Sequence, residues 1–289
     1  MDNKKLKDLL VRTASALVFG GAFVWAVWFS KWSLGVMLAL ILCVGVVEFY
    51  KICRRSGSEP MGAMGVALSM ALFGIAFTIF YQWGTPFTDL TARIVYGLLL
   101  YIMLMLPATF VCELWRKSST PLANIATTVM GVVYVSLPLS LLLFIPQLLV
   151  GEWSPKALLA YILIIWANDI FAYLVGVTIG RHRLCERISP KKSWEGFFGG
   201  VIGAAGIAVL MGYLFGGNLY LWGGLGVIVA LTGVAGDLVE SMLKRSAEMK
   251  DSGSIIPGHG GVLDRFDALL LSTPFAFIYL IILKNLIQI

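Results

Sequence analysis

Long apolar runs are the feature that most constrains how this chain can fold. Hydrophobic residues make up 59% of its 289 positions and charged residues only 13%, against about 25% charged residues in a typical soluble protein. A helix that crosses the hydrocarbon core of a membrane needs roughly 20 apolar residues, so each long run is a candidate span. Nine such runs follow one another, at residues 13–30, 33–52, 62–83, 93–114, 124–149, 157–179, 196–215, 219–243 and 266–284.

Backbone polar groups cannot stay unpaired in lipid, so we expect these runs to be helices. The chain is therefore predicted to be an all-α, polytopic integral membrane protein, a helical bundle with about nine transmembrane helices. The fifth run contains Pro138 and Pro146, and we expect it to kink or break there. The four cysteines form no CxxC pair, which favours packing roles over a zinc site or a disulfide framework.

The distribution of basic residues predicts the orientation in the membrane, because lysine and arginine collect on the cytoplasmic side. With a cytoplasmic N-terminus, 18 of the 22 Lys and Arg residues fall in inside segments and 4 in outside segments. We predict that orientation, and an uncleaved signal anchor for the first run, since no small-x-small cleavage site follows it. The net charge of +6 is then mainly a topology signal, and no nucleic acid partner is predicted. The expected location is the inner (cytoplasmic) membrane.

Polar residues are distributed unevenly along the chain. Outside the loops, the first 150 residues contain few polar side chains, whereas residues 166–267 contain many. We therefore expect residues 1–150 to be N-terminal scaffold helices that face lipid. Residues 151–289 are expected to form the catalytic membrane helices with their cytoplasmic active-site loops.

Charge is concentrated late in the chain, where residues 237–267 hold six acidic and four basic residues. Helical spacing places four polar residues of the eighth run on one face, namely Asp237, Glu240, Ser241 and Lys244. One interpretation is a cytoplasmic helix end with intrahelical ion pairs, such as Glu240 with Lys244. That interpretation explains Asp237 poorly, because Asp237 lies deeper, and ionisable residues inside a span usually serve a function. We expect a functional role for Asp237.

A glycine-rich turn and an acidic helix start follow. Residues 256–261 read IPGHGG, a run that cannot be regular helix and whose glycines allow backbone amides to approach a ligand. Glycine-rich turns also connect helices without binding anything, and no Walker-type lysine follows. Asp264 and Asp267 open the ninth helix, either as residues that suit its capping and dipole or as ligands that join Asp237 around Mg²⁺. These two interpretations of the acids are compatible.

Two polar stretches lie upstream. Asn168 and Asp169 interrupt the sixth run, where they either form interhelical hydrogen bonds or have a functional role. For Asp169 we favour the functional role, because an ionisable group inside a span is costly. The loop at residues 189–196 carries Lys191 and Lys192, which either flank a span or bind substrate. Glycines then recur at a spacing typical of close helix contact, at positions 196, 199, 200, 203 and 206.

The formal charge of residues 237–267 is −2 with His259 neutral. Such a segment would repel a nucleoside triphosphate by itself. A triphosphate ligand would therefore require divalent cations.

The late motifs resemble the signature of the phosphatidate cytidylyltransferases (CDP-diacylglycerol synthases). The matching pattern is Ser241-x-Leu-Lys-Arg, four residues, Lys250-Asp-x-Gly, and then Pro257-x-His-Gly-Gly-Val-x-Asp-Arg-Phe-Asp. The resemblance extends upstream through Gly236-Asp-Leu-x-Glu, Ser189-Pro-Lys-Lys-Ser-Trp-Glu-Gly and Asp169 with Phe-Ala-Tyr. It covers roughly residues 166–267, and the first 150 residues match only in hydrophobicity and helix count.

The resemblance implies an activity: CTP and phosphatidate give CDP-diacylglycerol and pyrophosphate, a step of phospholipid biosynthesis, with Mg²⁺ as cofactor. It also implies a homodimer in the membrane, an active site that faces the cytoplasm, and a second, monovalent cation such as K⁺ beside the magnesium. By position, the metal ligands are Asp237 and Asp264, with Asp267 as a further ligand.

The same resemblance distributes roles over the other site residues. Basic groups would contact the triphosphate or the phosphatidate phosphate: Lys244, Arg245, Lys250, His259 and Arg265. Lys191 and Lys192 would help to hold the substrate phosphates, with Ser193 and Glu195 shaping their loop. Asp169 would support the metal shell or orient a lysine. The substrate-binding set also includes Glu240, Ser241, Asp251, Gly260 and Gly261.

Two other functions remain open from the sequence. A CTP-dependent lipid or polyprenol kinase would share the nucleotide and the membrane but would transfer the γ-phosphate. A non-enzymatic transporter would explain buried acids at Asp169 and Asp237 but not a dense cytoplasmic Gly/His/Asp loop. The Asp-x-x-Asp-Gly-x-x-Ala-Arg pattern expected of a CDP-alcohol phosphotransferase is absent from the sequence.

Overall fold

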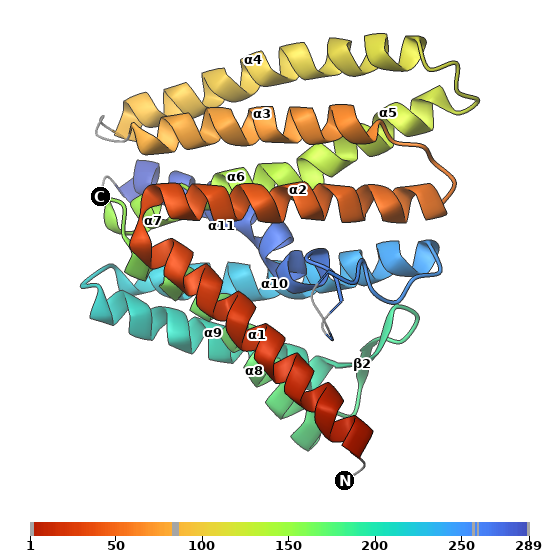
Figure 1. The fold of residues 1–289 in the computed structure, drawn as a ribbon. Coiled ribbons are helices and arrows are strands. Elements are labelled where there is room, and N and C mark those ends of the chain that lie inside the picture. The colour runs from red at the N-terminus through yellow and green to blue at the C-terminus, as the bar shows by residue number, and fades with distance from the viewer. Residues whose placement is uncertain (1–2, 83–86, 256–257, 259, 288–289) are drawn as a thin grey trace. The chain divides into compact units, whose positions relative to one another are not determined.

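The computed structural model describes residues 3–82, 87–255, 258 and 260–287, and these are almost entirely helical (Figure 1). Within this part of the chain, eight helices are long and apolar enough to cross a membrane. The first helix, α1 (Asn3–Phe29), adds a shorter apolar stretch, Thr13–Phe29. The prediction of a polytopic helical membrane protein with about nine spans is confirmed.

The chain forms two compact units, which are described separately. The first comprises Met1–Leu143 and Ser246–Arg265, and the second comprises Phe144–Arg245 and Phe266–Ile289. The chain therefore returns to its first unit for the segment Ser246–Arg265, which we call the return segment. The predicted division of roles between residues 1–150 and 151–289 stays a prediction.

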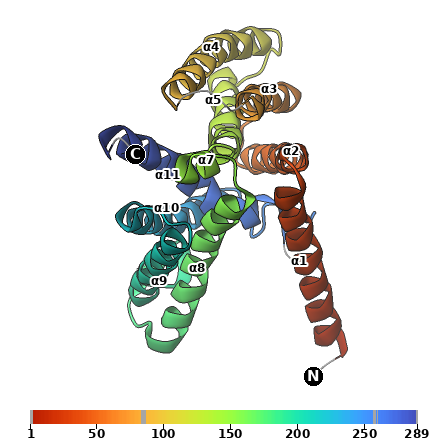
Figure 2. The same cartoon turned by 90° about the vertical axis from the view of Figure 1, so that its left-hand side faces the viewer.

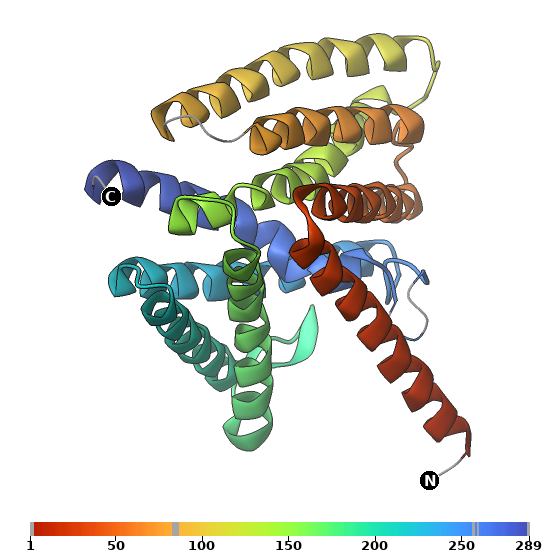
Figure 3. The ribbon, with the colours of Figure 1, turned by 60° about the vertical axis from the view of Figure 1, so that its left-hand side comes forward.

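The first unit is built from long helices that lie side by side, and Figure 3 shows α2, α3 and α4 in this arrangement. Ser30 begins the second helix, because its hydroxyl accepts a hydrogen bond from the Ser33 amide at 3.0 Å and closes a capping box. The unit contains α2 (Lys31–Arg55), α3 (Gly62–Tyr81), α4 (Phe87–Leu114), α5 (Pro121–Gly131), the π-helical turn η1 (Val132–Ser136) and α6 (Leu137–Leu142).

The fifth apolar run breaks before Pro146 but continues helically across Pro138, the other proline at which a kink or break was predicted. The helical path through α5, η1 and α6 ends at Leu142, and after two turn residues α7 (Ile145–Val150) begins with Pro146 in its first turn. Proline is tolerated in a first turn because the amide at that position has no helical partner. Pro138 likewise lies in the first turn of α6.

Tyr50 of α2 packs between two glycines in the core of the first unit. Its side chain is buried, and its hydroxyl donates to the Thr128 carbonyl oxygen at 2.8 Å. A Cβ atom at Gly65 of α3 or at Gly131 of α5 would overlap the phenol. These glycines therefore allow three helices to approach closely, as small residues do in membrane proteins.

The second unit places α8 and α9 side by side, as Figure 2 shows. Glycines of α9 face α8: Gly199 lies against Val175 and Gly203 against Phe171. The predicted helix-contact role is thereby confirmed for these two, while Gly206 has no neighbour within 4 Å. The unit contains α7, α8 (Pro155–Ile179), β1 (Arg183–Cys185), β2 (Ser189–Ser193), α9 (Trp194–Leu214), α10 (Leu219–Ser246) and α11 (Leu263–Ile287) from Phe266 onward.

A short β-hairpin connects α8 to α9, where the sequence predicted only a loop. The strands β1 and β2 are antiparallel and pair Arg183 with Ser193 and Cys185 with Ser189. Their sequence is charged and too short for an alternating apolar pattern, so the signal that identifies strands is missing. The fold class remains all-α with this hairpin added.

We predict that Gly65→Ala lowers the unfolding temperature of the protein. The added methyl group would press on Tyr50, which cannot move away because Gly131 lies against it, and overpacking of this kind costs about 1–3 kcal/mol. Gly74→Ala is the matched control on the same helix, since a Cβ there has no neighbour within 4 Å. Thermal unfolding in detergent would measure both, and equal unfolding temperatures would contradict the packing argument.

Candidate functional site

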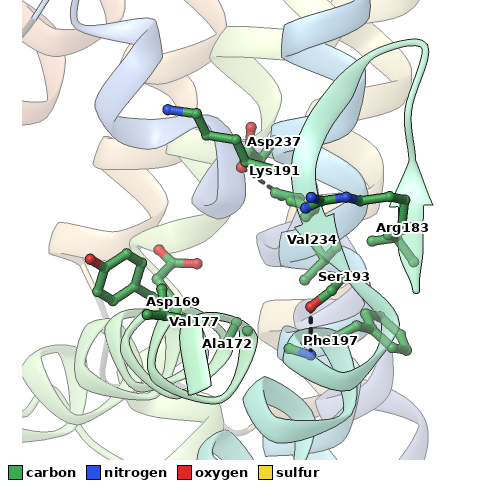
Figure 4. Close-up of a pocket in the computed structure, with 14 residues that line it drawn as sticks. Asp169, Ala172, Val177, Arg183, Lys191, Ser193, Phe197, Val234 and Asp237 are labelled. Carbon is green, nitrogen blue, oxygen red and sulfur yellow. Dashed lines mark hydrogen bonds and ion pairs between the residues drawn. The ribbon is translucent and has the colours of Figure 1, made fainter. Parts of the chain in front are cut away.

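The second unit contains a cavity of about 510 Å³ between α8, the hairpin, α9 and α10. Figure 4 shows Asp169, Lys191 and Asp237 around this cavity. The lining combines charged groups with an apolar wall. Its charged members are Asp169, Arg183, Lys191, Lys192 and Asp237, and its apolar members include Ala172, Val177, Phe197 and Val234.

An ion pair joins the hairpin to α10 at this cavity. The Lys192 Nζ atom lies 2.6 Å from the Asp237 Oδ2 atom, with both side chains partly exposed. The Ser241 hydroxyl, one turn further along α10, donates to the other Asp237 oxygen at 3.2 Å. The structure thus brings together three of the predicted site residues. Lys192 is the cationic partner of Asp237 in this structure.

Ser193 and Glu195 hold the hairpin against α9. The Ser193 hydroxyl caps α9 by accepting from the Gly196 amide at 3.1 Å. The Glu195 carboxylate accepts from the backbone amides of Arg181 and His182 and contacts the His182 Nδ1 atom at 2.6 Å. These contacts fix the strand that carries Lys191 and Lys192. Shaping that loop is the role that the sequence predicted for Ser193 and Glu195.

Asp169 reaches the cavity from α8. Its neighbour Asn168 is buried against Gly200 of α9, where a Cβ atom would overlap the amide, and it donates to the Asp169 carboxylate at 3.4 Å. Asn168 packs at a helix contact, but its Oδ1 atom has no hydrogen-bond partner among the described residues, so the expected interhelical hydrogen bond is not seen there. Asp169 lines the cavity, and its functional role stays a prediction.

The predicted pair between Glu240 and Lys244 is present on α10. Glu240 is buried, and the Lys244 Nζ atom lies 2.7 Å from its Oε2 atom. A buried carboxylate requires such a partner, because desolvation is costly. Lys244 thus interacts with an acid of its own helix. Its predicted contact with substrate stays a prediction.

Asp267 lies beside Asp237 because Gly236 lets α10 and α11 approach. A Cβ atom at Gly236 would lie 2.5 Å from the Asp267 carbonyl oxygen. Asp169, Asp237 and Asp267 are close enough to interact electrostatically. Three helices of the second unit therefore direct carboxylates toward one region.

This region fits a magnesium ion in its donor chemistry. Within the described part of the chain, no three His, Cys, Asp or Glu side chains are close enough to hold a metal ion by themselves. Magnesium usually takes one or two carboxylates and completes its shell with water and substrate phosphates. The hard oxygen donors of Asp237 and Asp267 suit that mode of binding, and Lys192 would have to leave Asp237 for it.

The return segment carries the remaining predicted residues, in the first unit. The Asp264 Oδ2 atom accepts from the Ser252 and Gly261 amides at 2.9 and 2.7 Å, and Gly260 adopts a positive φ of 85° directly against it. Asp264 therefore closes the loop that precedes α11. Among the other predicted residues, Arg245 in the second unit and Lys250, Asp251 and Arg265 in the first are exposed. His259 lies outside the described residues.

The sequence missed two residues that the structure associates with these sites. Arg183 lines the cavity, although sequence reasoning treated it only as a basic flank. Glu48 of α2 is buried and accepts a hydrogen bond from the Leu263 amide at 2.9 Å. The sequence could have identified Glu48 from its position inside an apolar run, because an ionisable residue in a span is a functional candidate by default.

Comparison with known proteins places the chain in a family. The sequence model of the cytidylyltransferase family matches residues 10–283. A phosphatidate cytidylyltransferase of Synechocystis sp. is 31% identical over 299 aligned residues, covering 93% of this chain and 92% of that protein. Proteins of the same name from Rickettsia bellii and Staphylococcus aureus (strain COL) are 36% and 47% identical. The Rickettsia match covers 62% of this chain and 79% of that protein, and the Staphylococcus match covers 41% and 46%. This chain therefore belongs to the cytidylyltransferase family and is a nucleotidyltransferase.

Proposed function

We propose that this protein is a phosphatidate cytidylyltransferase that transfers CMP from CTP to phosphatidate. The products are CDP-diacylglycerol and pyrophosphate. Similarity to relatives of that name along nearly the whole chain supports the proposal, as does the resemblance of residues 166–267 to the family signature.

The observation that carries the proposal is the mixed lining of the cavity in the second unit. Three cationic side chains, Arg183, Lys191 and Lys192, share it with the apolar side chains of Val177 and Phe197. Phosphatidate has the same two parts, a phosphate monoester and an apolar body. A soluble phosphate ester would gain nothing from the apolar wall.

The chemistry requires cations more than it requires a base. The second pKa of a phosphate monoester is about 6, so the attacking oxygen of phosphatidate is already ionised at neutral pH. That oxygen forms a bond to the α-phosphorus of CTP, and the bond from this phosphorus to the β-phosphate oxygen breaks. The main obstacle is the repulsion between two polyanions. Fixed positive groups reduce this repulsion and stabilise the charge on the departing pyrophosphate.

The residues of the chain divide this work. Lys191, Lys192 and Arg183 bind the phosphate of phosphatidate at the hairpin. By the family resemblance, Asp237 and Asp264 would hold Mg²⁺ with Asp267 as a further ligand, and the bound ion would supply Lewis-acid stabilisation of the phosphoryl oxygens. Candidate contacts for the triphosphate are Lys244, Arg245, Lys250, His259 and Arg265, and a K⁺ ion beside the magnesium stays part of the proposal.

The multi-pass membrane protein is proposed to lie in the cytoplasmic membrane with its N-terminus inside. In that orientation the hairpin and the return segment face the cytoplasm, where CTP is present. A homodimer is proposed from the family resemblance alone.

Labelled CTP distinguishes the proposed reaction from a lipid kinase. With phosphatidate as acceptor, we expect label from the α-phosphate to appear in the lipid and label from the γ-phosphate to appear in pyrophosphate. The reason is that cytidylyl transfer breaks the bond between the α- and β-phosphates. Thin-layer separation of the lipid extract measures the α-label, and the same separation of the aqueous phase measures labelled pyrophosphate. Lipid that carries only the γ-label would identify a CTP-dependent kinase and refute the proposal.

The pair of Lys192 and Asp237 is expected to act on substrates rather than to stabilise the fold. Lys192→Gln and Asp237→Asn should each lower kcat/KM by about 10²–10³-fold, the usual loss when one electrostatic contact to the reacting phosphates disappears. Lys192 would make that contact directly, and Asp237 would make it through the metal ion that it holds. The exposed hairpin acid Glu186 gives a matched control, and Glu186→Gln should leave kcat/KM unchanged. The swapped variant K192D/D237K keeps opposite charges at the two positions. Recovery of activity in this variant would show that the ion pair is merely structural.

Removal of divalent cations should weaken CTP binding as well as turnover. Residues 237–267 carry a formal charge of −2 with His259 neutral, and they repel a triphosphate unless cations reverse the local charge. Equilibrium binding of CTP would be measured in EDTA and again after excess Mg²⁺ is added. Tight binding of CTP in EDTA would contradict the charge argument.

A further inference from the structure

Glu48 is a buried carboxylate in the middle of an apolar helix, far in sequence from every motif residue. It lies on α2 of the first unit and is only 4% exposed. Its Oε2 atom accepts from the Leu263 amide at 2.9 Å, and the Ser252 hydroxyl lies 3.2 Å from the same atom. Both partners belong to the return segment of the same unit. Glu48 thus interacts with the loop that leads into α11.

Two glycines of the return segment make this approach possible. A Cβ atom at Gly253 would overlap the Glu48 carboxylate, and one at Gly261 would lie 2.6 Å from both of its oxygens. The sequence predicted that the glycines of residues 256–261 would let the backbone approach a ligand. The group that Gly261 approaches in this structure is a carboxylate of the same chain.

Ser252 links Glu48 to Asp264. The buried Ser252 hydroxyl lies 3.0 Å from the Asp264 Oδ2 atom and 3.2 Å from the Glu48 Oε2 atom. A hydroxyl has one hydrogen, so it donates to one carboxylate at a time. Asp264 keeps the two amide donors of Ser252 and Gly261 in either case. A change at Glu48 therefore reaches Asp264 through a single intervening side chain.

Stability alone explains Glu48 poorly. Its Oε1 atom has no hydrogen-bond partner among the described residues, and an incompletely satisfied buried carboxylate is costly. Glu113 of the same unit offers a contrast, because it is equally buried but binds Arg116 and Asn124 through separate oxygens, at 2.8 Å each. Glu113 has the contacts of a structural carboxylate, whereas the contacts of Glu48 all lie on the loop.

We infer that Glu48 is a positioning residue for the proposed cytidylyl transfer, holding Ser252 and the start of α11 so that Asp264 keeps one orientation. The catalytic part of this inference rests on the proposed function. Glu48 touches no substrate in this scheme and acts through Ser252. The first unit thereby contributes to the reaction by positioning Asp264, in addition to serving as a lipid-facing scaffold.

The test compares Glu48→Gln with Glu113→Gln in the full-length protein. Glu48→Gln should lower kcat by about 10–100-fold, the usual effect of losing an outer partner of a ligand residue, while KM for CTP changes much less. It should also accelerate hydrogen exchange at the amides of Ser252, Gly261 and Leu263, which donate to the Asp264 and Glu48 carboxylates. Glu113→Gln should lower the unfolding temperature and leave both kcat and the exchange of these amides near wild type.

Ser252→Ala provides a second test of the link. If Glu48 acts through Ser252, the double variant E48Q/S252A should be no slower than the more impaired single variant, because residues of one network are not additive. Wild-type exchange and wild-type kcat in Glu48→Gln would overturn the inference. Fully additive losses, or equal losses of kcat in the two glutamine variants, would also overturn it. If the wild-type protein transfers no cytidylyl group, the proposed function fails, and the exchange comparison still decides whether Glu48 orders the segment.

Discussion

The structure depends on one constraint: a charge in an apolar chain needs a partner at close range. The buried acids of the described residues illustrate this constraint. Glu113 binds Arg116 and Asn124, Glu240 binds Lys244, and Glu48 binds amide and hydroxyl groups of the return segment. Because each partner comes from a defined position, the few charges also fix local geometry. Most of the chain is apolar and supplies packing area, whereas these few interactions determine where the polar loops are held.

Glycine is the second means by which this chain positions its polar groups. Gly65 and Gly131 make room for Tyr50, whose hydroxyl then reaches a backbone carbonyl, and Gly236 brings α10 against α11 beside Asp237. Gly261 admits the Glu48 carboxylate. At each position the missing side chain allows a polar atom or a second backbone to approach. Small residues therefore do more here than allow helices to pack, since they also determine which polar groups meet.

The sequence predicts interactions that depend on local spacing. The apolar runs predicted the helices, and Pro146 predicted the break before α7. The separation of four residues predicted the pair of Glu240 and Lys244. The site as a whole was less accessible. Lys192 meets Asp237 across 45 residues, and Glu48 meets Ser252 across 204, and no local pattern encodes such contacts. The hairpin was missed for a related reason, because contacts of Glu195 with the preceding residues hold it rather than an alternating apolar pattern.

The two lysine–carboxylate pairs of the second unit differ in a way that bears on mechanism. The pair of Lys244 and Glu240 is enclosed, with side-chain exposures of 13% and 1%, whereas those of Lys192 and Asp237 are 27% and 39%. Separation of the enclosed pair would leave a buried carboxylate without its cation, which is strongly unfavourable. Separation of a partly exposed pair costs only about 0–1 kcal/mol. In the proposed reaction, Lys192 would therefore exchange Asp237 for a substrate phosphate at little cost and leave the carboxylate available to a metal ion. Lys244 would keep its contact with the buried Glu240 carboxylate during this exchange.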